Sequence, residues 1–399
     1  MIAEIQPFTL HGEVEAPSSK SLCHRLLIGA ALTEGKSTIS NVLFSKDIEA
    51  TIRCLKKLGA AVEAKDDTVM IDGTHFLETI DPILDCGESG STLRFLIPIA
   101  LLCDQKITFT GSERLLSRPQ DVYESIAEEH HFLFERNKDC INVKGKLEAG
   151  TYTVRGNISS QFITGLIFAL SRLDSPSRVV ILPPIESGSY IRLTLQAMSY
   201  FGADIQMRNN EIVICPKQLK TYEGKVEADE SNAAFLDAYN LIGSDVKVLG
   251  LCENTIQGDA VYHRDYELLK KEKAVLDLAD CPDLGPVYMA LAALNHGALL
   301  NNTHRLKEKE SDRGAAMKEE LEKAGAEVIL EDNRIEVKAH PLKKKDLVFS
   351  SHNDHRIVMA MTLVASLTGG KIEGAEAVAK SFPDYFDKIS ALGAKVRMK

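Results

Sequence analysis

A single pattern of apolar and polar positions recurs along the chain. A helical pattern ends at a glycine. Two short segments of alternating apolar and polar residues then follow, separated by a polar turn, as in an antiparallel hairpin. Three clear copies follow Gly59, Gly202 and Gly325, and a weaker one begins at His131. The last copy, at residues 392–396, ends the chain after one strand. The pattern predicts a protein assembled from related α/β units.

The spacing of the copies indicates how many units there are. Successive copies are about 70 residues apart, a period long enough for a helix-and-strand unit rather than a solenoid turn. The interval between Gly202 and Gly325 is too short for two such periods. A hairpin is due near residue 270, but residues 268–278 lack the Leu-Gly-Ala signature. We therefore predict six units, of which the fourth is abbreviated.

The length of 399 residues is sufficient for two domains, each with its own core. Six units divide most naturally into two domains of three. The predicted division places residues 1–18 and 227–399 in the first domain and residues 19–226 in the second. If both termini belong to one domain, a cleft lies between the two lobes.

Composition narrows the functional classes. The chain is 44% hydrophobic and 26% charged, which is typical of a soluble globular protein, and its net charge of −10 disfavours a general binder of nucleic acid or anionic membranes. Its eight cysteines form no C-x-x-C pair and indicate a reducing compartment. The N-terminus lacks a charged-then-apolar leader, and the apolar run 95–103 is too short to span a bilayer. We expect a cytoplasmic protein.

Several predicted helices open on small polar residues accompanied by a cation. The segments are Pro17-Ser-Ser-Lys20-Ser21, residues 87–94 and Asn353-Asp-His-Arg356. Free backbone N–H groups, the positive end of the helix dipole and a basic side chain together favour an anion. Arg25 lies one turn beyond Ser21 and shares its face. Ordinary N-caps with solvated cations are the alternative, and no Walker Gly-Lys-Ser/Thr sequence is present.

Further segments have both a structural and a functional interpretation. Ser159-Ser160-Gln161 and Ser187-Gly-Ser-Tyr190 open apolar helices as caps, or their hydroxyl and amide groups hold a polyol. Residues 307–313 form a solvated charged helix face or part of a charged site. Lys380 stands just before a Pro-containing helix start and has no evident structural role.

A metal site was also considered, because His352 and His355 are three residues apart. No further His or Cys with suitable spacing supports such a site, and Asn-Asp is typical of a turn and cap. We therefore predict no metal.

Taken together and in order, eight segments resemble those of the EPSP synthase family, the 3-phosphoshikimate 1-carboxyvinyltransferases. They are residues 17–21, 87–94, 118–119, 159–161, 281–283, 309–313, 353–356 and 380–386. The resemblance covers nearly the whole chain. It implies a two-domain inside-out α/β barrel in which each domain consists of three βαβαββ units around buried parallel helices. It also implies a cleft that closes on substrate.

The resemblance implies a division of labour among the site residues. Those expected to bind shikimate 3-phosphate are Lys20, Ser21, Arg25, Ser159, Ser160, Gln161, Ser187, Tyr190, Asp283 and Lys309. Those expected to bind phosphoenolpyruvate are Lys20, Gly90, Arg118, Gln161, Arg313, Arg356 and Lys380. Asp283 is expected to accept the proton of the substrate hydroxyl, and Glu310 to donate one to the methylene carbon, with Lys20 as the alternative acid.

The implied reaction adds the 5-hydroxyl of shikimate 3-phosphate to phosphoenolpyruvate and then eliminates phosphate, a step of aromatic amino acid biosynthesis. It needs no cofactor or metal, and we expect a monomer whose partners are these two small molecules. The chain departs from the family pattern at Glu88-Ser89, Ser91, Ala228 and Arg305. The departure at Arg305 replaces an Asn and puts a contact with the substrate phosphate in question.

Three rival functions remain. One is a catalytically silent anion-binding protein, which Asp283 and Glu310 disfavour. UDP-N-acetylglucosamine 1-carboxyvinyltransferase would share the fold and phosphoenolpyruvate, but it usually carries a Cys in the loop corresponding to residues 111–121, where this chain has none. A nucleic-acid-end processing protein built from similar repeats is disfavoured by the acidic balance.

Overall fold

The computed structural model describes residues 1–343 and 347–399 and divides the chain into two compact units. Unit 1 combines Met1–Pro17 with Ala228–Lys399, and unit 2 is Ser18–Glu227. The chain therefore passes between the units twice, once between residues 17 and 18 and once between residues 227 and 228.

Unit 2, in which every residue is described, contains three four-stranded sheets. In order of hydrogen-bonded neighbours, the sheets are β14 (Glu223–Lys225), β3 (Lys36–Ser40), β5 (Thr68–Asp72) and β4 (Ala61–Lys65); β6 (Ile83–Asp85), β7 (Ile107–Thr110), β9 (Ile141–Lys144) and β8 (Leu133–Arg136); and β10 (Thr151–Arg155), β11 (Ser177–Leu182), β13 (Glu211–Cys215) and β12 (Asp204–Arg208). The helices are α1 (Lys20–Ala31), α2 (Lys46–Lys57), α3 (Gly90–Ala100), α4 (Glu113–Ser117), α5 (Asp121–His130), α6 (Ser160–Leu170) and α7 (Gly188–Tyr200).

Unit 1 has, among its described residues, two four-stranded sheets and one of two strands. They are β20 (Val348–Ser350), β21 (Gly370–Glu373), β1 (Ile2–Ile5) and β22 (Val396–Met398); β16 (Ala274–Asp277), β17 (Ala298–Asn301), β19 (Arg334–Lys338) and β18 (Glu327–Leu330); and β15 (Asp245–Leu249) with β2 (His11–Glu15). The α-helices are α8 (Glu230–Asp237), α9 (Tyr262–Leu269), α10 (Gly285–Leu294), α11 (Arg313–Ala324), α12 (His355–Thr368) and α13 (Tyr385–Ala391). The 3₁₀ helices are η1 (Ala238–Ile242), η2 (Gly258–Val261), η3 (Pro282–Leu284), η4 (His304–Glu308) and η5 (Ala375–Lys380).

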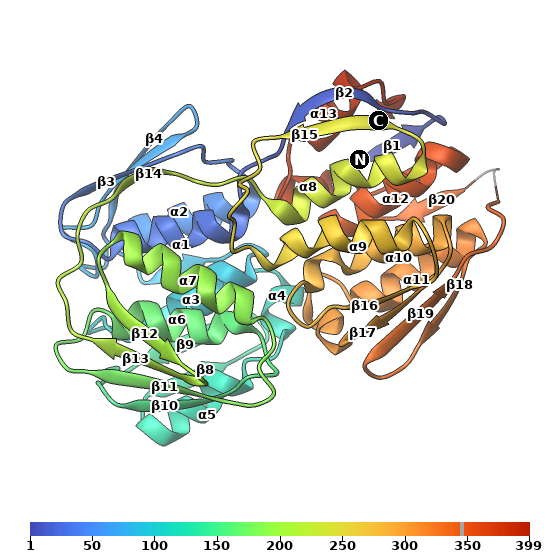
Figure 1. Ribbon diagram of the computed structural model, residues 1–399. Coiled ribbons are helices and arrows are strands. Elements are labelled where there is room, and N and C mark those ends of the chain that lie inside the picture. The colour runs from blue at the N-terminus through green and yellow to red at the C-terminus, as the bar shows by residue number, and fades with distance from the viewer. Residues whose placement is uncertain (344–346) are drawn as a thin grey trace. The chain divides into compact units, whose positions relative to one another are not determined.

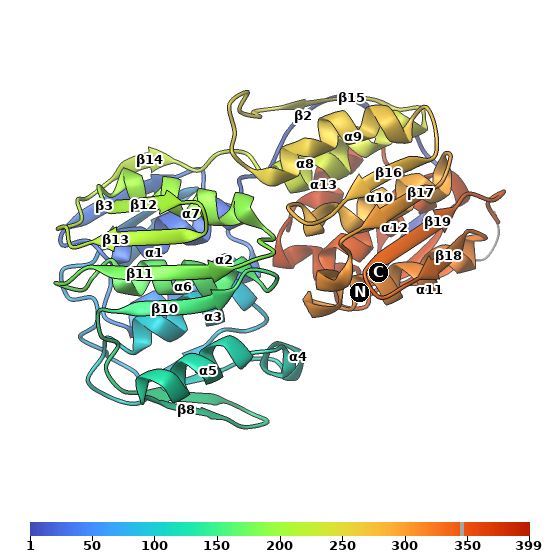
Figure 2. The same ribbon diagram turned by 60° about the horizontal axis from the view of Figure 1, so that its bottom comes forward.

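Each four-stranded sheet follows one plan, in which a parallel pair of strands is extended by an antiparallel pair. That pair is a hairpin in every such sheet except the one that contains β1 and β22. In unit 2, for example, β10 pairs with β11 in parallel, and β11 then pairs with β13 of the hairpin β12–β13. Helices connect the strands and lie inside each unit, with the sheets on its outside (Figures 1 and 2). Since α3, α6, α10 and α12 are apolar on nearly all sides, they are stable only when surrounded by protein. The inside-out α/β architecture is as predicted.

The recurring glycines mark the ends of helices, as predicted. Gly59, Gly202, Gly325 and Gly393 have φ angles of 105°, 74°, 105° and 109°, a left-handed conformation that glycine adopts without steric cost. The first three precede the hairpins β4–β5, β12–β13 and β18–β19, and the weaker copy forms β8–β9. The fourth, Gly393, precedes β22, whose partner is β1 at the opposite end of the chain. The last copy thus takes its antiparallel neighbour from the N-terminal segment.

The fourth of the six α/β repeats is abbreviated, as the spacing predicted. Its parallel pair is β2 and β15, and the chain then runs through α9 directly to β16, which belongs to the next sheet. In the part of the chain that the structure describes, no hairpin extends β15. The second edge of this short sheet therefore lacks the strands that the other five units supply.

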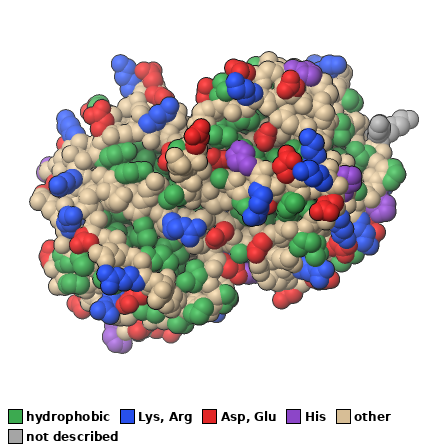
Figure 3. All heavy atoms as spheres, in the orientation of Figure 1, with side chains coloured by type: hydrophobic (Ala, Val, Ile, Leu, Met, Phe, Trp, Pro, Cys, Tyr) green, Lys and Arg blue, Asp and Glu red, His purple; other side chains and the backbone are tan. Residues whose placement is uncertain are grey.

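The surface carries mixed charges. On the face shown in Figure 3, basic and acidic side chains are interspersed, in keeping with the net charge of −10. Within the described ranges, no helix combines the length and the apolar character needed to cross a membrane.

Candidate active site

In unit 1, three cations surround one carboxylate. Asp283 lies in η3, and its Oδ1 accepts hydrogen bonds from Lys309 Nζ at 3.1 Å and Arg313 Nη1 at 2.8 Å, while its Oδ2 accepts one from Arg356 Nη2 at 3.0 Å. The side chains of Arg313 and Arg356 are almost fully buried. Arg313 also donates from Nη2 to Glu310 Oε2 at 2.8 Å. The two carboxylates predicted to divide the acid and base roles therefore share one guanidinium.

Asp354 fixes this guanidinium from the other side. Its Oδ2 accepts from Arg313 Nε at 2.8 Å and from Ser311 Oγ at 3.1 Å. Its Oδ1 accepts the backbone N–H of Arg356 at 2.9 Å, which caps the N-terminus of α12. One fully buried carboxylate thus holds the side chain of Arg313 and the backbone at Arg356.

The charges of the cluster displace its pKa values. Burial by itself would raise the pKa of Asp283, but the charges of Arg356, Lys309 and Arg313 outweigh burial and hold that pKa well below its usual range. Burial lowers the pKa of Lys309, and Asp283 opposes this effect. Burial would lower the pKa of Arg313 as well, but Asp354, Glu310 and Asp283 raise it further. Asp283 is therefore ionised at neutral pH, and Arg313 is permanently charged.

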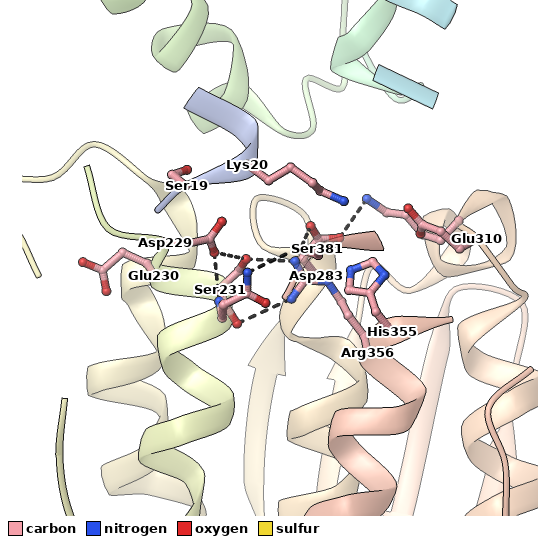
Figure 4. Close-up of polar contacts among 12 residues, drawn as sticks. Ser19, Lys20, Asp229, Glu230, Ser231, Asp283, Glu310, His355, Arg356 and Ser381 are labelled. Carbon is pink, nitrogen blue, oxygen red and sulfur yellow. Dashed lines mark hydrogen bonds and ion pairs between the residues drawn. The ribbon is translucent and has the colours of Figure 1, made fainter. Parts of the chain in front are cut away.

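A second set of hydrogen bonds connects Arg356 to α8 (Figure 4). Arg356 Nη2 donates to Ser231 Oγ at 2.8 Å, and the Ser231 hydroxyl donates to Asp229, the N-cap of α8. On the same helix, Asn232 Nδ2 donates to Ser381 Oγ at 3.2 Å. Residues of two predicted site segments are thus tied to α8, the helix that follows the second crossing between units.

The remaining predicted residues of unit 1 are also held by specific contacts. Lys380 is buried and donates to the backbone oxygen of Asn353, in the turn before α12. Arg305 is buried in η4, close enough to Lys309 for its charge to act on that lysine. The interpretation of residues 307–313 as a solvated helix face is wrong for Arg313, which begins α11 and is buried.

In unit 2, Lys20 and Arg25 project from the first turns of α1. Lys20 Nζ forms an ion pair with Asp47 Oδ2 of α2 at 2.9 Å. Arg25 donates from Nε to Thr194 Oγ1 at 2.8 Å and from Nη2 to the backbone oxygen of Tyr190 at 3.2 Å, and Nη1 donates to the Ser21 oxygen at 2.6 Å. Burial lowers the pKa of Arg25 to about 10, so it is still charged at neutral pH.

The N-terminus of α3 is crowded by an arginine. A Cβ atom on Gly90 would lie 2.6 Å from Arg118 Nη1, closer than atoms can approach without a shift. Gln161, in the first turn of α6, accepts from Arg94 Nη1 at 3.0 Å and donates to Ser91 Oγ at 3.0 Å. Glycine at position 90 therefore leaves the space that the guanidinium fills.

The predicted hydroxyl groups lie at two helix starts of unit 2. Ser159 is the N-cap of α6, and its Oγ accepts from the backbone N–H of Gln161. Ser160 is the first residue of that helix and is buried. Ser187 precedes α7 in a left-handed conformation with φ 54°, and its side chain makes no capping hydrogen bond. Ser187 is thus not the ordinary side-chain cap that its sequence context allowed.

The family model described as EPSP synthase (3-phosphoshikimate 1-carboxyvinyltransferase) matches residues 5–389 of the chain. The chain belongs to the EPSP synthase family. It is 40% identical over 424 residues to the 3-phosphoshikimate 1-carboxyvinyltransferase of Clostridium novyi (strain NT), covering 98% of this chain and 97% of the relative. It is 36% identical over 427 residues to that of Clostridioides difficile (strain 630), covering 98% of both.

Solved structures show the same fold. EPSP synthase from Acinetobacter baumannii superimposes with a TM-score of 0.80 at 21% identity, over 99% of both chains. The enolpyruvyl transferase NikO from Streptomyces tendae superimposes with a TM-score of 0.75 at 13% identity, over 99% of this chain and 98% of that one. At such identities the likeness concerns the fold alone.

The two histidines considered for a metal have different partners in this EPSP synthase family member. His352 Nε2 lies 2.7 Å from Glu320 Oε1, and His355 Nδ1 lies 3.7 Å from Asp354. Glu319, Glu320 and His352 could together hold an ion, since their ligand atoms lie within 4.8 Å of one another. However, Lys323 Nζ already contacts both oxygens of Glu320, at 2.9 and 2.8 Å. An ammonium group therefore supplies the positive charge there.

Sequence reasoning did not find three residues that hold the predicted ones in place. They are Asp354, which orients Arg313; Asp47, which pairs with Lys20; and Ser231, which contacts Arg356. For Asp354 a signal existed, because it stands in a segment that matches a family motif, and Ser231 stands three residues after the departure at Ala228. For Asp47 the only signal was its place in the first turn of a predicted helix, which is typical of acidic residues in general.

Proposed function

We propose that this chain is a 3-phosphoshikimate 1-carboxyvinyltransferase. It transfers the carboxyvinyl group of phosphoenolpyruvate to the 5-hydroxyl of shikimate 3-phosphate and releases phosphate, in the biosynthesis of aromatic amino acids. The observation that carries the proposal is the cluster in unit 1, where Asp283 is surrounded by Lys309, Arg313 and Arg356 and Glu310 shares Arg313. Such a cluster offers cations for an anionic substrate and carboxylates for proton transfer.

The proposal assigns phosphoenolpyruvate to the cationic residues. They are Lys20, Arg118, Arg313, Arg356 and Lys380, with Gly90 and Gln161. Arginines suit this role because their planar guanidinium groups bind carboxylate and phosphate in bidentate fashion. The burial of Arg313 and Arg356 supports it, since cations held rigidly in a partly dry site stabilise developing negative charge without reorganisation.

Shikimate 3-phosphate is assigned to hydroxyl groups and to the residues around them. They are Ser21, Arg25, Ser159, Ser160, Gln161, Ser187 and Tyr190, with Lys20, Asp283 and Lys309 at the reacting end. The burial of Ser159, Ser160 and Ser187 at helix starts supports the assignment, since a phosphate there would accept hydrogen bonds from hydroxyl groups and from free backbone N–H groups.

In the proposed reaction, the oxygen of the 5-hydroxyl attacks C2 of phosphoenolpyruvate while Asp283 takes the proton of that hydroxyl group. Glu310 donates a proton to C3, or Lys20 does so in its place. The resulting tetrahedral intermediate then returns a proton from C3 to the deprotonated donor and expels phosphate. Before substrate binds, the three cations make Asp283 a poor base because they stabilise its carboxylate form. When a bound anion draws Lys309, Arg313 and Arg356 away, that stabilisation is lost and the pKa of Asp283 rises.

The proposal further holds that the enzyme acts as a cytoplasmic monomer without a metal or organic cofactor. Every proton transfer and every charge in the scheme is supplied by a side chain of the chain itself. Dialysis against a chelator before the assay checks the metal part of this proposal, since activity should be unchanged.

The test is phosphate release by the purified protein in the presence of phosphoenolpyruvate and either shikimate 3-phosphate or UDP-N-acetylglucosamine. We expect release with shikimate 3-phosphate only, and none when either substrate is omitted. Release with the nucleotide sugar instead would favour UDP-N-acetylglucosamine 1-carboxyvinyltransferase, and release with neither would overturn the proposed function.

A further inference from the structure

A continuous chain of buried hydrogen bonds connects three helices of unit 2. His24 Nδ1 of α1 lies 2.8 Å from Thr51 Oγ1 of α2, which lies 2.6 Å from Thr92 Oγ1 of α3. Thr92 Oγ1 in turn donates to Ser89 Oγ at 2.7 Å. All four side chains have an exposed fraction of 0%. We name His24, Thr51, Thr92 and Ser89 the hydroxyl chain.

The direction of these bonds determines the state of His24. A hydroxyl group has one proton, and Thr92 donates its proton to Ser89, so Thr51 must donate to Thr92. The proton of Thr51 is then spent, and the bond to His24 must come from Nδ1–H. Burial and the charges of Lys20 and Arg25 hold the pKa of His24 well below its usual range. His24 is thus neutral, with its proton on Nδ1.

The hydroxyl chain lies beside predicted ligand residues at both ends. On α1 and α2, the His24–Thr51 contact lies one turn after the Lys20–Asp47 ion pair, so both contacts fix the same register between the two helices. On α3, Ser89 Oγ also accepts the backbone N–H of Thr92 at 3.1 Å and so caps the helix directly before Gly90.

We propose that Thr51 and Thr92 are positioning residues for phosphoenolpyruvate, which hold the N-terminus of α3 against those of α1 and α2. Loss of either hydroxyl would let α3 shift by a fraction of an ångström. The shift would move Gly90, and with it the space that Arg118 Nη1 fills. It would also move α3 relative to Lys20. The inference rests on the proposed function, since it assumes that these residues bind that substrate.

The experiment measures steady-state kinetics for Thr51→Val, which keeps the shape of the side chain and removes the hydroxyl. Misplacement of binding groups raises KM or lowers the rate steeply, and we expect the KM for phosphoenolpyruvate to rise by about tenfold. The KM for shikimate 3-phosphate should rise less, by about twofold to threefold, because Lys20 and Gln161 serve both substrates whereas Arg25 and Ser159 are held by contacts outside the hydroxyl chain. Thr51→Ser restores the hydroxyl and should restore the KM.

The control is Thr33→Val. Thr33 is equally buried and donates to the backbone oxygen of Ala30 at 2.8 Å, just beyond the other end of α1. It should lower the melting temperature as Thr51→Val does but leave both KM values unchanged. If Thr51→Val does not fold, Thr92→Ser and Thr92→Ala take its place. The first keeps the Thr92 hydroxyl group and the second removes it, so only the second should raise the KM for phosphoenolpyruvate.

Two outcomes overturn the inference. With an active wild-type enzyme, an unchanged KM for phosphoenolpyruvate in Thr51→Val, or an equal rise in Thr33→Val, would reduce the hydroxyl chain to core packing and leave the proposed function intact. A wild-type protein that does not turn over the two substrates would overturn the proposed function, and this inference with it.

Discussion

Asp283 is bound on both of its oxygens, by Lys309 and Arg313 on one and by Arg356 on the other. Such an arrangement costs free energy if any member is removed, because the others remain buried without compensation. It also leaves a base that is weak until an anion competes for its partners. A residue of this kind links stability, protonation and catalysis, and each can be measured separately.

Replacing Asp283 with Asn should lower the free energy of unfolding at neutral pH by about 3 kcal/mol, since the buried Arg313 and Arg356 and the partly exposed Lys309 lose their shared counter-charge. The pKa of Asp283 is lower in the folded protein than its ordinary value of 3.8, so its stabilisation is complete above that value and is lost as the pH falls through the lowered pKa. Melting temperatures of both proteins from pH 8 to pH 3 check this.

The expected difference between the two melting temperatures is constant from neutral pH down to the ordinary carboxyl range and shrinks only below it. A difference that fades between pH 7 and pH 5 would mean that Asp283 is not held ionised by its neighbours. Equal stability of the two proteins at neutral pH would have the same meaning.

Gly90→Ala tests the space beside Arg118. The added methyl group would lie 2.6 Å from Arg118 Nη1, so the guanidinium must move, and we expect the KM for phosphoenolpyruvate to rise with little change in that for shikimate 3-phosphate. Gly150→Ala is the matched control, because a Cβ atom there would have open space around it. Equal kinetics of the two variants would remove Arg118 and Gly90 from the binding site.

The sequence was sufficient to nominate Arg313 and Asp283 through the order of the motifs that contain them. It could not show that Asp354 orients Arg313, because the two residues are 41 positions apart and Asn-Asp before a helix is typical of any cap. Nor could it show the contact between Thr51 and Thr92. Threonines at such positions are unremarkable until the fold brings their hydroxyl groups together.

Helix N-termini are the elements on which this site is built. Ser19, Ser89 and Ser159 cap α1, α3 and α6 in unit 2, and Asp312 and Asp354 cap α11 and α12 in unit 1. The side chain of each cap accepts a hydrogen bond from a backbone N–H group of the first turn. The geometry of that turn then sets the direction of the basic or polar side chain that follows the cap. The hydrophobic pattern predicted these helices well, because their buried sides are long and apolar.

Asp354 both caps α12 and orients Arg313, and two substitutions separate these roles. Asp354→Asn keeps an oxygen for the cap but loses the charge that pairs with Arg313, so kcat/KM should fall at least about tenfold and the free energy of unfolding should fall by about 3 kcal/mol. Asp354→Ala should lose about 1 kcal/mol more, from the cap. Asp312→Ala removes the cap of α11. It should likewise lower the free energy of unfolding by about 1 kcal/mol but leave kcat/KM nearly unchanged. If Asp312→Ala impairs turnover as much as Asp354→Asn, then Asp354 does not support catalysis through its ion pair with Arg313.

At the scale of the whole molecule, each unit carries its own sheets and its own core. The strands of unit 2 pair only with one another among the described residues, and the strand β14 that completes its first sheet lies just before the crossing back to unit 1. Unit 1, by contrast, depends on both ends of the chain, because β1 and β22 are neighbours. The repeats in the sequence predicted the α/β repeats of the structure. They could not identify β1 as the partner of the last strand, because β1 lies at the other end of the sequence.

A fragment comprising residues 18–227 should therefore fold by itself. We expect a cooperative thermal transition and a circular dichroism spectrum of mixed helix and strand. We also expect no phosphate release, since the fragment lacks Asp283 and Glu310. A fragment without a cooperative transition would show that unit 2 requires the rest of the chain for stability.

The measurement that tests the central claim most directly is turnover of phosphoenolpyruvate and shikimate 3-phosphate in D₂O, followed by mass spectrometry of the carboxyvinyl product. Addition followed by elimination passes through a methyl group, so the account predicts deuterium in the vinyl methylene together with released phosphate. Glu310→Gln should suppress both, whereas the neighbouring Glu308→Gln should not. Full incorporation by Glu310→Gln would assign the acid role to Lys20, and a product formed without deuterium would contradict the account.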